Sequence, residues 1–490
     1  MAEHGTCCIF AEDIDMSYVF VDTGQCGNQL GCSILDSLHQ HLMDDPIELD
    51  SFFRISESRN KSTTYARAVC IDTEPKVIQA CMQRIKDKKS WLFDSQSTVY
   101  GHGGAGNNWA MGYGICRGDF LESSLEGIRR ELEMCSGPPT LIITHSVAGG
   151  TGSGCGTRIT EATSDEFPDV NRMNIAVTPY HFGEVVVQHF NTVLCLSKLS
   201  SASHGVLTFE NEVAKQLCIE MKGIERPTLH DINDIIAANI VPALLPKRLF
   251  NDEHNSYTTY SSTIADDIGE LCSHPGYRFL TVKNVPQTSK RSVAFTYDSW
   301  TSLVDTLQRM NLKGSSSERG TGSSTAAFSR PKTPLSDQTS YTNSDQIPCT
   351  RTDSSPSFRS LKSVLTLRGP DALSGLHALK ETSIVASNAY VPHSKRASSN
   401  TQAPVTTMFD DTRCVIHHST HTVNKYQRSA VLLSNSQEVL PLLQRAALKA
   451  AAMYRAGAYV HQYKSCGLED DDFVRAFRTV GQVVENYGSI

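Results

Sequence analysis

The feature of this sequence that most constrains its fold is a dense run of glycines directly after an apolar segment, in 141-LIITHSVAGGTGSGCGT-157. Glycine lets successive backbone N–H groups turn towards one anion, and the hydroxyl residues Thr151 and Ser153 stand among the glycines. A helix that begins here would add the positive end of its dipole. We therefore expect a strand, a phosphate-cradling loop and a helix, in that order; a plain flexible turn is the alternative.

Two further glycine-rich segments, 24-GQCGNQLG-31 and 101-GHGGAGNNWAMGYG-114, are expected to lie at the same edge of the sheet. Three loops at the carboxyl ends of parallel strands would wall a nucleotide crevice. None of the three contains lysine or arginine, so backbone amides and a metal would have to meet the phosphate charge. The loop after residue 147 therefore does not match G-x-x-x-x-G-K-[ST], and its spacing does not give G-x-G-x-x-G.

Apolar runs bounded by turn residues predict buried strands, and helical spacing of apolar residues predicts helices between them. The strands are expected at 18–22, 69–72, 141–144 and 174–179, and an S-x-x-E signal at Ser123 predicts the start of one helix. Alternation of strand and helix favours parallel pairing. The predicted fold class is α/β, with a doubly wound parallel sheet for the nucleotide, a smaller mixed α/β intermediate domain and a C-terminal helical hairpin.

At 490 residues the chain suits two or three domains. We expect a flexible extension over 1–15, a nucleotide-binding domain over 16–218, an intermediate domain over 219–433 and C-terminal helices over 434–490. The two closing helices are predicted at 438–463 and 471–487. Within the intermediate domain, 314–360 has 20 Ser or Thr among 47 residues, which predicts a disordered insertion because so little apolar surface can be buried.

Charge and cysteine content exclude several classes of protein. The net charge of −7 argues against nucleic acid as the main partner, since a phosphate-binding surface needs an excess of Lys and Arg. No apolar run is long enough to cross a membrane, so no membrane partner is expected. The 15 cysteines include no C-x-x-C pair, which favours reduced thiols in a cytoplasmic protein.

One carboxylate stands out near the glycine loops. Glu74, in 71-IDTEP-75, follows a predicted strand and would hold Mg²⁺ through water at the same sheet edge. A solvated turn carboxylate is the alternative.

Taken together, GQCGNQLG, GAGNNWA and GGTGSG resemble the tubulin superfamily, from about Met16 to the C-terminus. Within it, 183-GEVVVQHFNTVLCLSKL-199 and 459-YVHQYKSCGLEDDDF-473 are most similar to the delta subfamily. The resemblance implies GTP or GDP with Mg²⁺ as cofactors, and other tubulins and centriole or basal-body proteins as partners. It also implies a structural role in the cytoskeleton, at the centriole, basal body and cilium, in support of triplet microtubules.

The resemblance assigns nucleotide contacts to Gln25, Cys26, Glu74, Asn107, Ser146, Gly150, Thr151, Gly152, Asn211 and Asn233. Asn211 and Asn233 would read guanine, since an amide offers both a donor and an acceptor; either could instead be a structural cap. Asp267 and Glu270 match the D-x-x-E of the hydrolysis-promoting helix in alpha-tubulin, although the distance on to Pro275 is shorter. Glu270 is thus predicted to act on a neighbouring subunit's nucleotide, giving a weak GTPase that only a neighbour completes.

Several residues depart from the family pattern. Leu229 replaces a tyrosine that stacks on the base, Gln188 replaces a ribose-binding glutamate, and His230 replaces a glycine of the loop that approaches the next subunit. His230 and the insertion could both obstruct contacts between subunits. They leave open a second hypothesis, a guanine-nucleotide-responsive regulatory factor that does not enter a microtubule lattice. A third hypothesis, a dinucleotide oxidoreductase, is disfavoured because the main loop lacks G-x-G-x-x-G.

Overall fold

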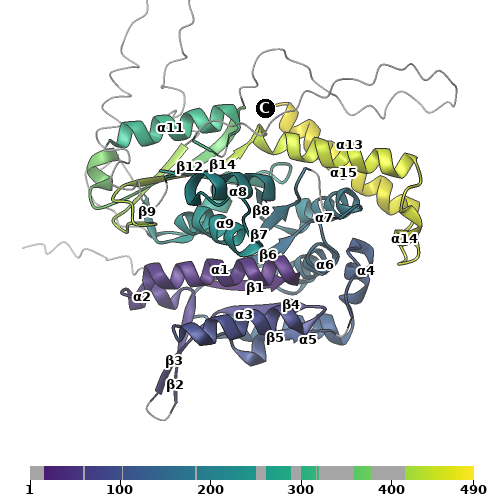
Figure 1. The fold of residues 1–490 in the computed structure, drawn as a ribbon, viewed down its shortest axis with the longest axis horizontal. Coiled ribbons are helices and arrows are strands. Elements are labelled where there is room, and N and C mark those ends of the chain that lie inside the picture. The colour runs from purple at the N-terminus through teal and green to yellow at the C-terminus, as the bar shows by residue number, and fades with distance from the viewer. Residues whose placement is uncertain are drawn as a thin grey trace, which may run out of the picture.

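The computed structural model describes residues 16–58, 61–101, 103–181, 185–249, 261–288, 299–315, 317–318, 358–376 and 414–490. The extension expected over 1–15 and most of the insertion expected over 314–360 lie outside these residues. Within them, one sheet of twelve strands runs through the molecule with helices on both faces (Figure 1). No helix in this described part is long and apolar enough to cross a membrane.

Six parallel strands form the first half of the sheet, in the order β5-β4-β1-β6-β7-β8. They are β1 Ser17–Thr23, β4 Ala68–Asp72, β5 Thr98–Tyr100, β6 Pro139–Ser146, β7 Asn171–Thr178 and β8 Gly205–Glu210. The chain first builds outwards from β1 to β5 and then returns to add β6 on the other side of β1. This order confirms the predicted doubly wound sheet and puts its switch point between β1 and β6.

The strand β1 is buried on both faces, as expected for a parallel sheet covered by helices. Tyr18 and Phe20 face one layer, which contains α1 (Gly24–Leu42) and α9 (Leu229–Leu244). Val19 and Val21 face the opposite layer, which contains α5 (Asp119–Glu133) and α6 (Thr151–Glu166). Successive residues therefore point to opposite faces, and both faces are apolar.

The remaining helices and the hairpin complete the two layers. They are α2 Pro46–Asp50, α3 Pro75–Lys88, α4 Trp109–Ile115, α7 Gln188–Ala202, α8 Asn211–Leu217, and the hairpin β2 Phe53–Ser58 with β3 Lys61–Ala66. The helix start predicted at Ser123 is wrong, because α5 begins at Asp119, directly after Gly118 with φ +53°. A glycine in the left-handed region turned the chain earlier than the S-x-x-E signal indicated.

The second half of the sheet is mixed. Strand β11 (Phe279–Val285) pairs parallel to β8 and antiparallel to β14 (Ser429–Ser436), so it joins the two halves. Beyond β14 lie β12 (Ser360–Arg368), β13 (Cys414–Ser419), β9 (Lys247–Leu249) and β10 (Ser261–Ser262). The helix α11 (Trp300–Lys313) packs on this half, and α10 (Ile264–Leu271) follows β10.

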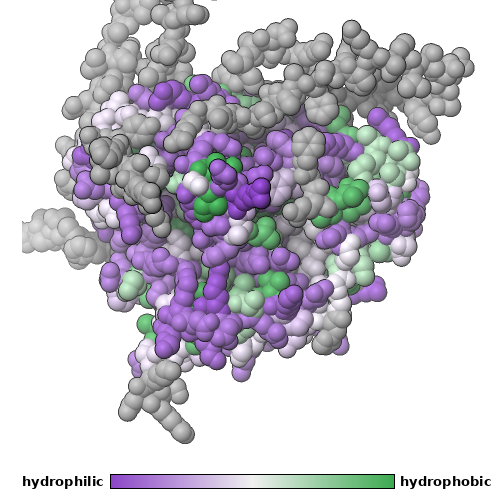
Figure 2. All heavy atoms as spheres, viewed as in Figure 1, coloured by the Kyte–Doolittle hydropathy of each residue, from purple (hydrophilic) through white to green (hydrophobic). Residues whose placement is uncertain are grey.

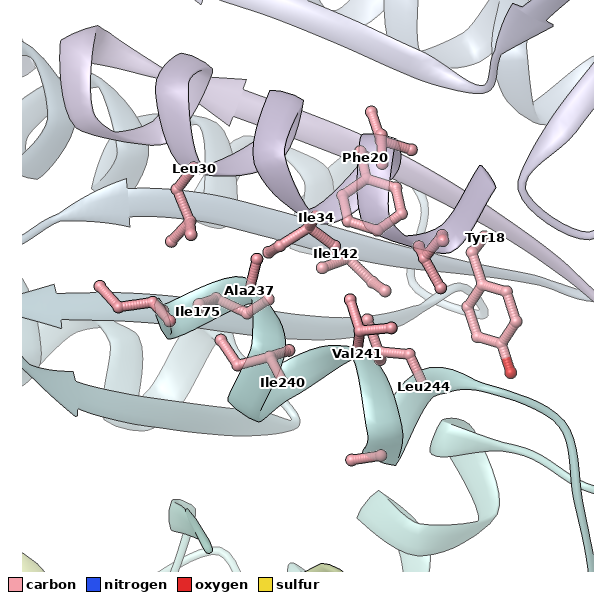
Figure 3. Packing of buried hydrophobic residues seen from close by; sticks show 14 of the residues in the cluster. Tyr18, Phe20, Leu30, Ile34, Ile142, Ile175, Ala237, Ile240, Val241 and Leu244 are labelled. Atoms are coloured by element: carbon pink, nitrogen blue, oxygen red, sulfur yellow. The ribbon is translucent and has the colours of Figure 1, made fainter. Parts of the chain in front are cut away.

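The helix α9 is the central element of the core. Ala237, Ile240 and Val241 pack against Leu30 and Ile34 of α1 and against the sheet (Figure 3). Its C-terminal carbonyl groups are held from the second half of the sheet. The buried guanidinium of Arg368, at the end of β12, donates to the carbonyl oxygens of Pro242, Leu245 and Pro246.

The C-terminal helices cover α7 on one side of the molecule (Figure 1). They are α13 (Leu440–Arg455), α14 (Val460–Lys464) and α15 (Asp470–Gly488). The single helix predicted over 438–463 is wrong, because Gly457 and Tyr459 have φ of +65° and +62° and break it. Leu448, on α13, is 52% exposed. Figure 2 shows apolar residues in green at the right of the molecule, where the C-terminal helices lie.

We expect Arg368→Met to lower the free energy of unfolding by about 2 kcal/mol or more, because three carbonyl groups lose their donor. Burial of the guanidinium lowers the pKa of Arg368 to about 9. Removing this buried charge is favourable and offsets part of the loss. Urea unfolding measures the difference. The exposed Arg359, just before β12, gives the matched control Arg359→Met, for which a change within about 0.5 kcal/mol is expected. Equal stability of both variants would contradict the role of Arg368.

Candidate functional site

A cavity of about 480 Å³ opens at the carboxyl ends of the parallel strands. All ten residues predicted to contact nucleotide line it: Gln25, Cys26, Glu74, Asn107, Ser146, Gly150, Thr151, Gly152, Asn211 and Asn233. They come from segments up to about two hundred residues apart, and the switch point between β1 and β6 brings them to one place. The arrangement brings every predicted nucleotide contact to a single cavity; Glu270, which is predicted to act on a neighbouring subunit, is not among them.

One end of the cavity is built for an anion. The helix α6 begins there at Thr151, with no acidic residue in its first turn and no side chain that caps it. The first N–H groups of a helix lack intrahelical acceptors and carry the positive end of its dipole. The hydroxyl groups of Thr151 and Thr73 lie 2.7 Å apart at the same point. Backbone amides and hydroxyl groups thus supply the donors at this end.

The glycines hold the loops against one another. A Cβ on Gly150 would lie 2.6 Å from the carbonyl oxygen of Ala105 and 2.8 Å from the amide nitrogen of Asn108. A Cβ on Gly24, whose φ is +72°, would lie 2.7 Å from the amide nitrogen of Gly152. All three glycine-rich segments therefore meet backbone to backbone. The alternative of a plain flexible turn is wrong, because close packing requires the glycines.

The two neighbouring asparagines at 107 and 108 differ in their surroundings. Asn107 lines the cavity with a φ of +53°, in the left-handed region that asparagine tolerates. Asn108 is the N-cap of α4, and its side-chain oxygen accepts from the amides of Ala110 and Met111. The structure thus leaves Asn107 facing the cavity and uses Asn108 to start a helix.

Two carboxylates line the same end as α6. Glu74 is exposed, whereas Asp72 is buried, and burial raises the pKa of Asp72 to about 6. None of the described lining residues is a lysine or arginine. A phosphate-bearing ligand would need a cation between itself and these carboxylates, and oxygen ligands suit Mg²⁺. Sequence analysis missed Asp72, although it stands two residues before Glu74 at the end of the same strand.

The opposite end of the cavity presents amides. Asn211 begins α8 and Asn233 lies in the second turn of α9, and neither caps its helix. Within the described residues, neither side chain has a hydrogen-bond partner, so both amides are available to a ligand. Cys26 also lines the cavity, and burial raises the pKa of its thiol to about 12, so it stays neutral. The alternative interpretation of the asparagines as helix caps is wrong.

The departures from the family pattern lie at this end as well. Leu229 is 51% exposed at the cavity mouth, where it offers an aliphatic surface in place of an aromatic ring. Gln188 is buried, and its side-chain amide donates to the carbonyl oxygen of Tyr180. Tyr180 itself lines the cavity and was missed by sequence analysis, since nothing in its local pattern distinguished it.

Glu270 lies far from this cavity. It is on α10, whose first residue, Ile264, donates from its backbone to the hydroxyl of Tyr18 at the amino end of β1. The cavity lies at the carboxyl end of that seven-residue strand, roughly 20 Å away. Glu270 pairs with Lys362, and Asp267 is buried in a pair with Lys247. A catalytic role for Glu270 remains a prediction and requires a second subunit.

We expect Gly152→Asp to abolish nucleotide binding, because it adds a carboxylate where the N-terminus of α6 meets the anion end. Nucleotide released from purified protein, quantified per chain, measures the effect, and Thr151→Val provides a milder change that only removes a hydroxyl. Gly269→Asp is the matched control, since Gly269 is exposed on α10 with no atom near its Cβ position. Stoichiometric nucleotide in Gly152→Asp protein would place the site elsewhere.

Comparisons with known proteins support the fold. Residues 17–219 match the model of the Tubulin/FtsZ family, GTPase domain. A tubulin delta chain from Homo sapiens is 30% identical over 489 residues, covering 96% of this chain and 99% of the relative. The mouse delta chain is 29% identical, covering 97% and 100%, and a mouse tubulin epsilon chain is 35% identical over 40% of this chain and 44% of its own. The chain therefore belongs to the tubulin family and is similar to its delta chains over nearly its whole length.

Proposed function

We propose that this protein holds GTP or GDP with Mg²⁺ in the cavity at the switch point and acts as a delta-type tubulin. The observation that carries the proposal is the convergence of all ten predicted contacts on this one cavity. The N-terminus of α6 at one end suits phosphate, and the amides of Asn211 and Asn233 at the other suit the edge of guanine. The GTPase-domain match over 17–219 supports guanine nucleotide as the ligand.

Magnesium is proposed from the charge of the cavity. Asp72 and Glu74 put two carboxyl groups beside the expected phosphates, and the described lining offers no cationic side chain. Mg²⁺ usually keeps several waters and binds through one or two carboxylates together with substrate phosphates. Asp72 and Glu74 would hold the ion, Glu74 through water, and the bound ion would neutralise phosphate charge.

The cellular role is proposed from likeness to delta chains. Identity of about 30% over nearly the full length supports a structural protein of the cytoskeleton whose partners are other tubulins. We place it in the cytoplasm, at centrioles, basal bodies and cilia, in the assembly or maintenance of triplet microtubules. Tagged protein that never concentrates at centrioles or basal bodies would overturn this role.

His230 favours a second candidate, a nucleotide-responsive regulator outside the lattice. Its exposed ring stands at the start of α9, and its Nδ1 lies 3.0 Å from the guanidinium of Arg84 on α3. By the resemblance, His230 stands where related tubulins have a loop that approaches the next subunit, so the pair with Arg84 would add bulk at that contact. Pelleting with microtubules separates the two candidates. Co-pelleting supports the lattice protein, whereas protein that stays in the supernatant and whose behaviour depends on the bound nucleotide supports the regulator.

Hydrolysis would depend on a neighbour. Glu270 is at the opposite end of the sheet from the cavity of its own chain. It can therefore act only on nucleotide bound to a second subunit that stacks against this end. We therefore propose that an isolated chain has at most a weak GTPase activity.

We expect Asn233→Asp to weaken GTP binding by at least about 1–3 kcal/mol, because it removes an amide donor and adds charge. Asn239→Asp is the matched control. Asn239 is buried on the same helix but bonds its own backbone at Ile235 and does not line the cavity. Titration calorimetry with GTP and ATP measures affinity and base selectivity. Unchanged GTP affinity in Asn233→Asp would refute the assignment to guanine.

We expect Glu74→Gln to raise the free Mg²⁺ concentration needed to retain nucleotide about tenfold. This is the usual loss of metal affinity when a partner that acts through a metal-bound water is removed. The carboxylate loses its charge but keeps its shape, so the fold should not change. The exposed Glu122 on α5 gives the control Glu122→Gln. The measurement is nucleotide release as a function of free Mg²⁺. Identical curves for wild type and Glu74→Gln would rule out this carboxylate.

A further inference from the structure

A buried asparagine behind the cavity makes every hydrogen bond its amide can offer. Asn191, on α7, is fully buried. Its side-chain nitrogen donates to the carbonyl oxygens of Asn107 at 2.8 Å and Ala148 at 2.7 Å. Its side-chain oxygen accepts from the amide of Trp109 at 2.9 Å and from the hydroxyl of Tyr463 at 2.6 Å. Two donors and two acceptor positions are all used.

The two carbonyl groups held by Asn191 belong to the walls of the cavity. Asn107 and Ala148 both line it, and Asn107 has a positive φ that its surroundings must maintain. The loop that contains Asn107 also packs against the residue just before α6, since a Cβ on Gly150 would lie 2.8 Å from the amide nitrogen of Asn108. A shift of Asn191 would therefore move the start of α6.

The hydroxyl of Tyr463 fills the second acceptor position of the side-chain oxygen of Asn191 and so holds this residue from α14. The backbone amide of Trp109 and the two carbonyl groups fix which way the side chain of Asn191 faces, because a flipped amide would lose these three bonds. Burial raises the pKa of Tyr463 well above its usual range, which keeps the hydroxyl a donor. Tyr463 is itself no lining residue and comes from α14, among the C-terminal helices.

A second bond ties the same helix to the same wall. The side-chain nitrogen of Asn108 donates to the carbonyl oxygen of Gln462 at 3.3 Å. The bond at Gln462 reaches the segment that packs on Gly150 directly, and the bond from Tyr463 reaches it through Asn191. The outer residues of α14, His461 and Lys464, are exposed, so this short helix lies between the solvent and the cavity wall.

We propose that Tyr463 is a positioning residue for the phosphate end of the nucleotide site and acts through Asn191. The inference rests on the proposed function, that guanine nucleotide occupies this cavity. It makes the C-terminal helices part of the machinery that holds nucleotide, although none of them contributes a lining residue among those described.

The chain offers a matched control in Tyr487. It is also fully buried on a C-terminal helix, α15, and its hydroxyl also donates to an asparagine oxygen, that of Asn435, at 2.8 Å. The same hydroxyl accepts from the backbone amide of Phe279. None of these residues lines the cavity. Tyr487→Phe should therefore cost at least as much stability as Tyr463→Phe and leave the cavity alone.

The test compares both full-length variants with wild type by nucleotide release, thermal unfolding and hydrogen exchange. We expect Tyr463→Phe to release GDP about fivefold faster than wild type, the effect of one buried hydrogen bond, and to exchange faster at the amides of 105–111. Tyr487→Phe should release GDP at the wild-type rate and exchange faster near Phe279. Equal release rates for the two variants, at similar loss of stability, would overturn the inference.

Two further results keep the test decisive. Asn191→Asp retains the acceptor for Tyr463 but loses both donors to the cavity walls, so it should release GDP at least as fast as Tyr463→Phe. Wild-type retention by folded Asn191→Asp protein would overturn the inference even if Tyr463→Phe did not fold. Wild-type protein that binds no guanine nucleotide would instead overturn the proposed function, and this inference with it.

Discussion

Backbone-to-backbone contact between the glycine-rich loops is the constraint on which the rest of this structure depends. The loops after β1, β5 and β6 meet where the order of the parallel sheet reverses, and they approach so closely that a single Cβ at Gly24 or Gly150 would collide with backbone. This contact fixes where α6 begins and where its dipole points. It explains how a cavity without a described lysine or arginine can still be built for phosphate.

The two ends of the molecule support this contact by different means. On one side, Arg368 holds the C-terminal carbonyl groups of α9, whose other end carries Asn233 into the cavity. On the other side, α7 and α14 hold the cavity walls through Asn191 and Tyr463. Both supports are buried side-chain groups that satisfy backbone polar atoms, and such bonds are most costly to lose where water cannot replace them. The proposed nucleotide site is therefore held by hydrogen bonds from distant parts of the chain.

Sequence patterns predicted the elements that local chemistry controls. The four apolar runs correspond to β1, β4, β6 and β7. A strand buried on both faces is apolar along its whole length, so its own sequence is enough to identify it. Sequence patterns failed where a single backbone angle determined the residue at which a helix begins or ends. A left-handed Gly118 started α5 four residues before Ser123, and left-handed Gly457 and Tyr459 divided a predicted helix into α13 and α14. Asp72 was missed because its burial, which raises its pKa to about 6, depends on neighbours distant in sequence.

The sequence by itself determined the α/β class, the phosphate-type glycine loop and, through its motifs, the ten residues that line one cavity. Those features are local, since glycine spacing and hydrophobic runs act within a few residues. Only the tertiary structure decided that Asn107 faces the cavity while Asn108 caps a helix, and that Glu270 stands at the opposite end of the sheet. It alone brought Tyr463 to Asn191 across 272 residues. Hydrogen bonds of that kind depend on which elements pack together, and no short stretch of sequence contains this information.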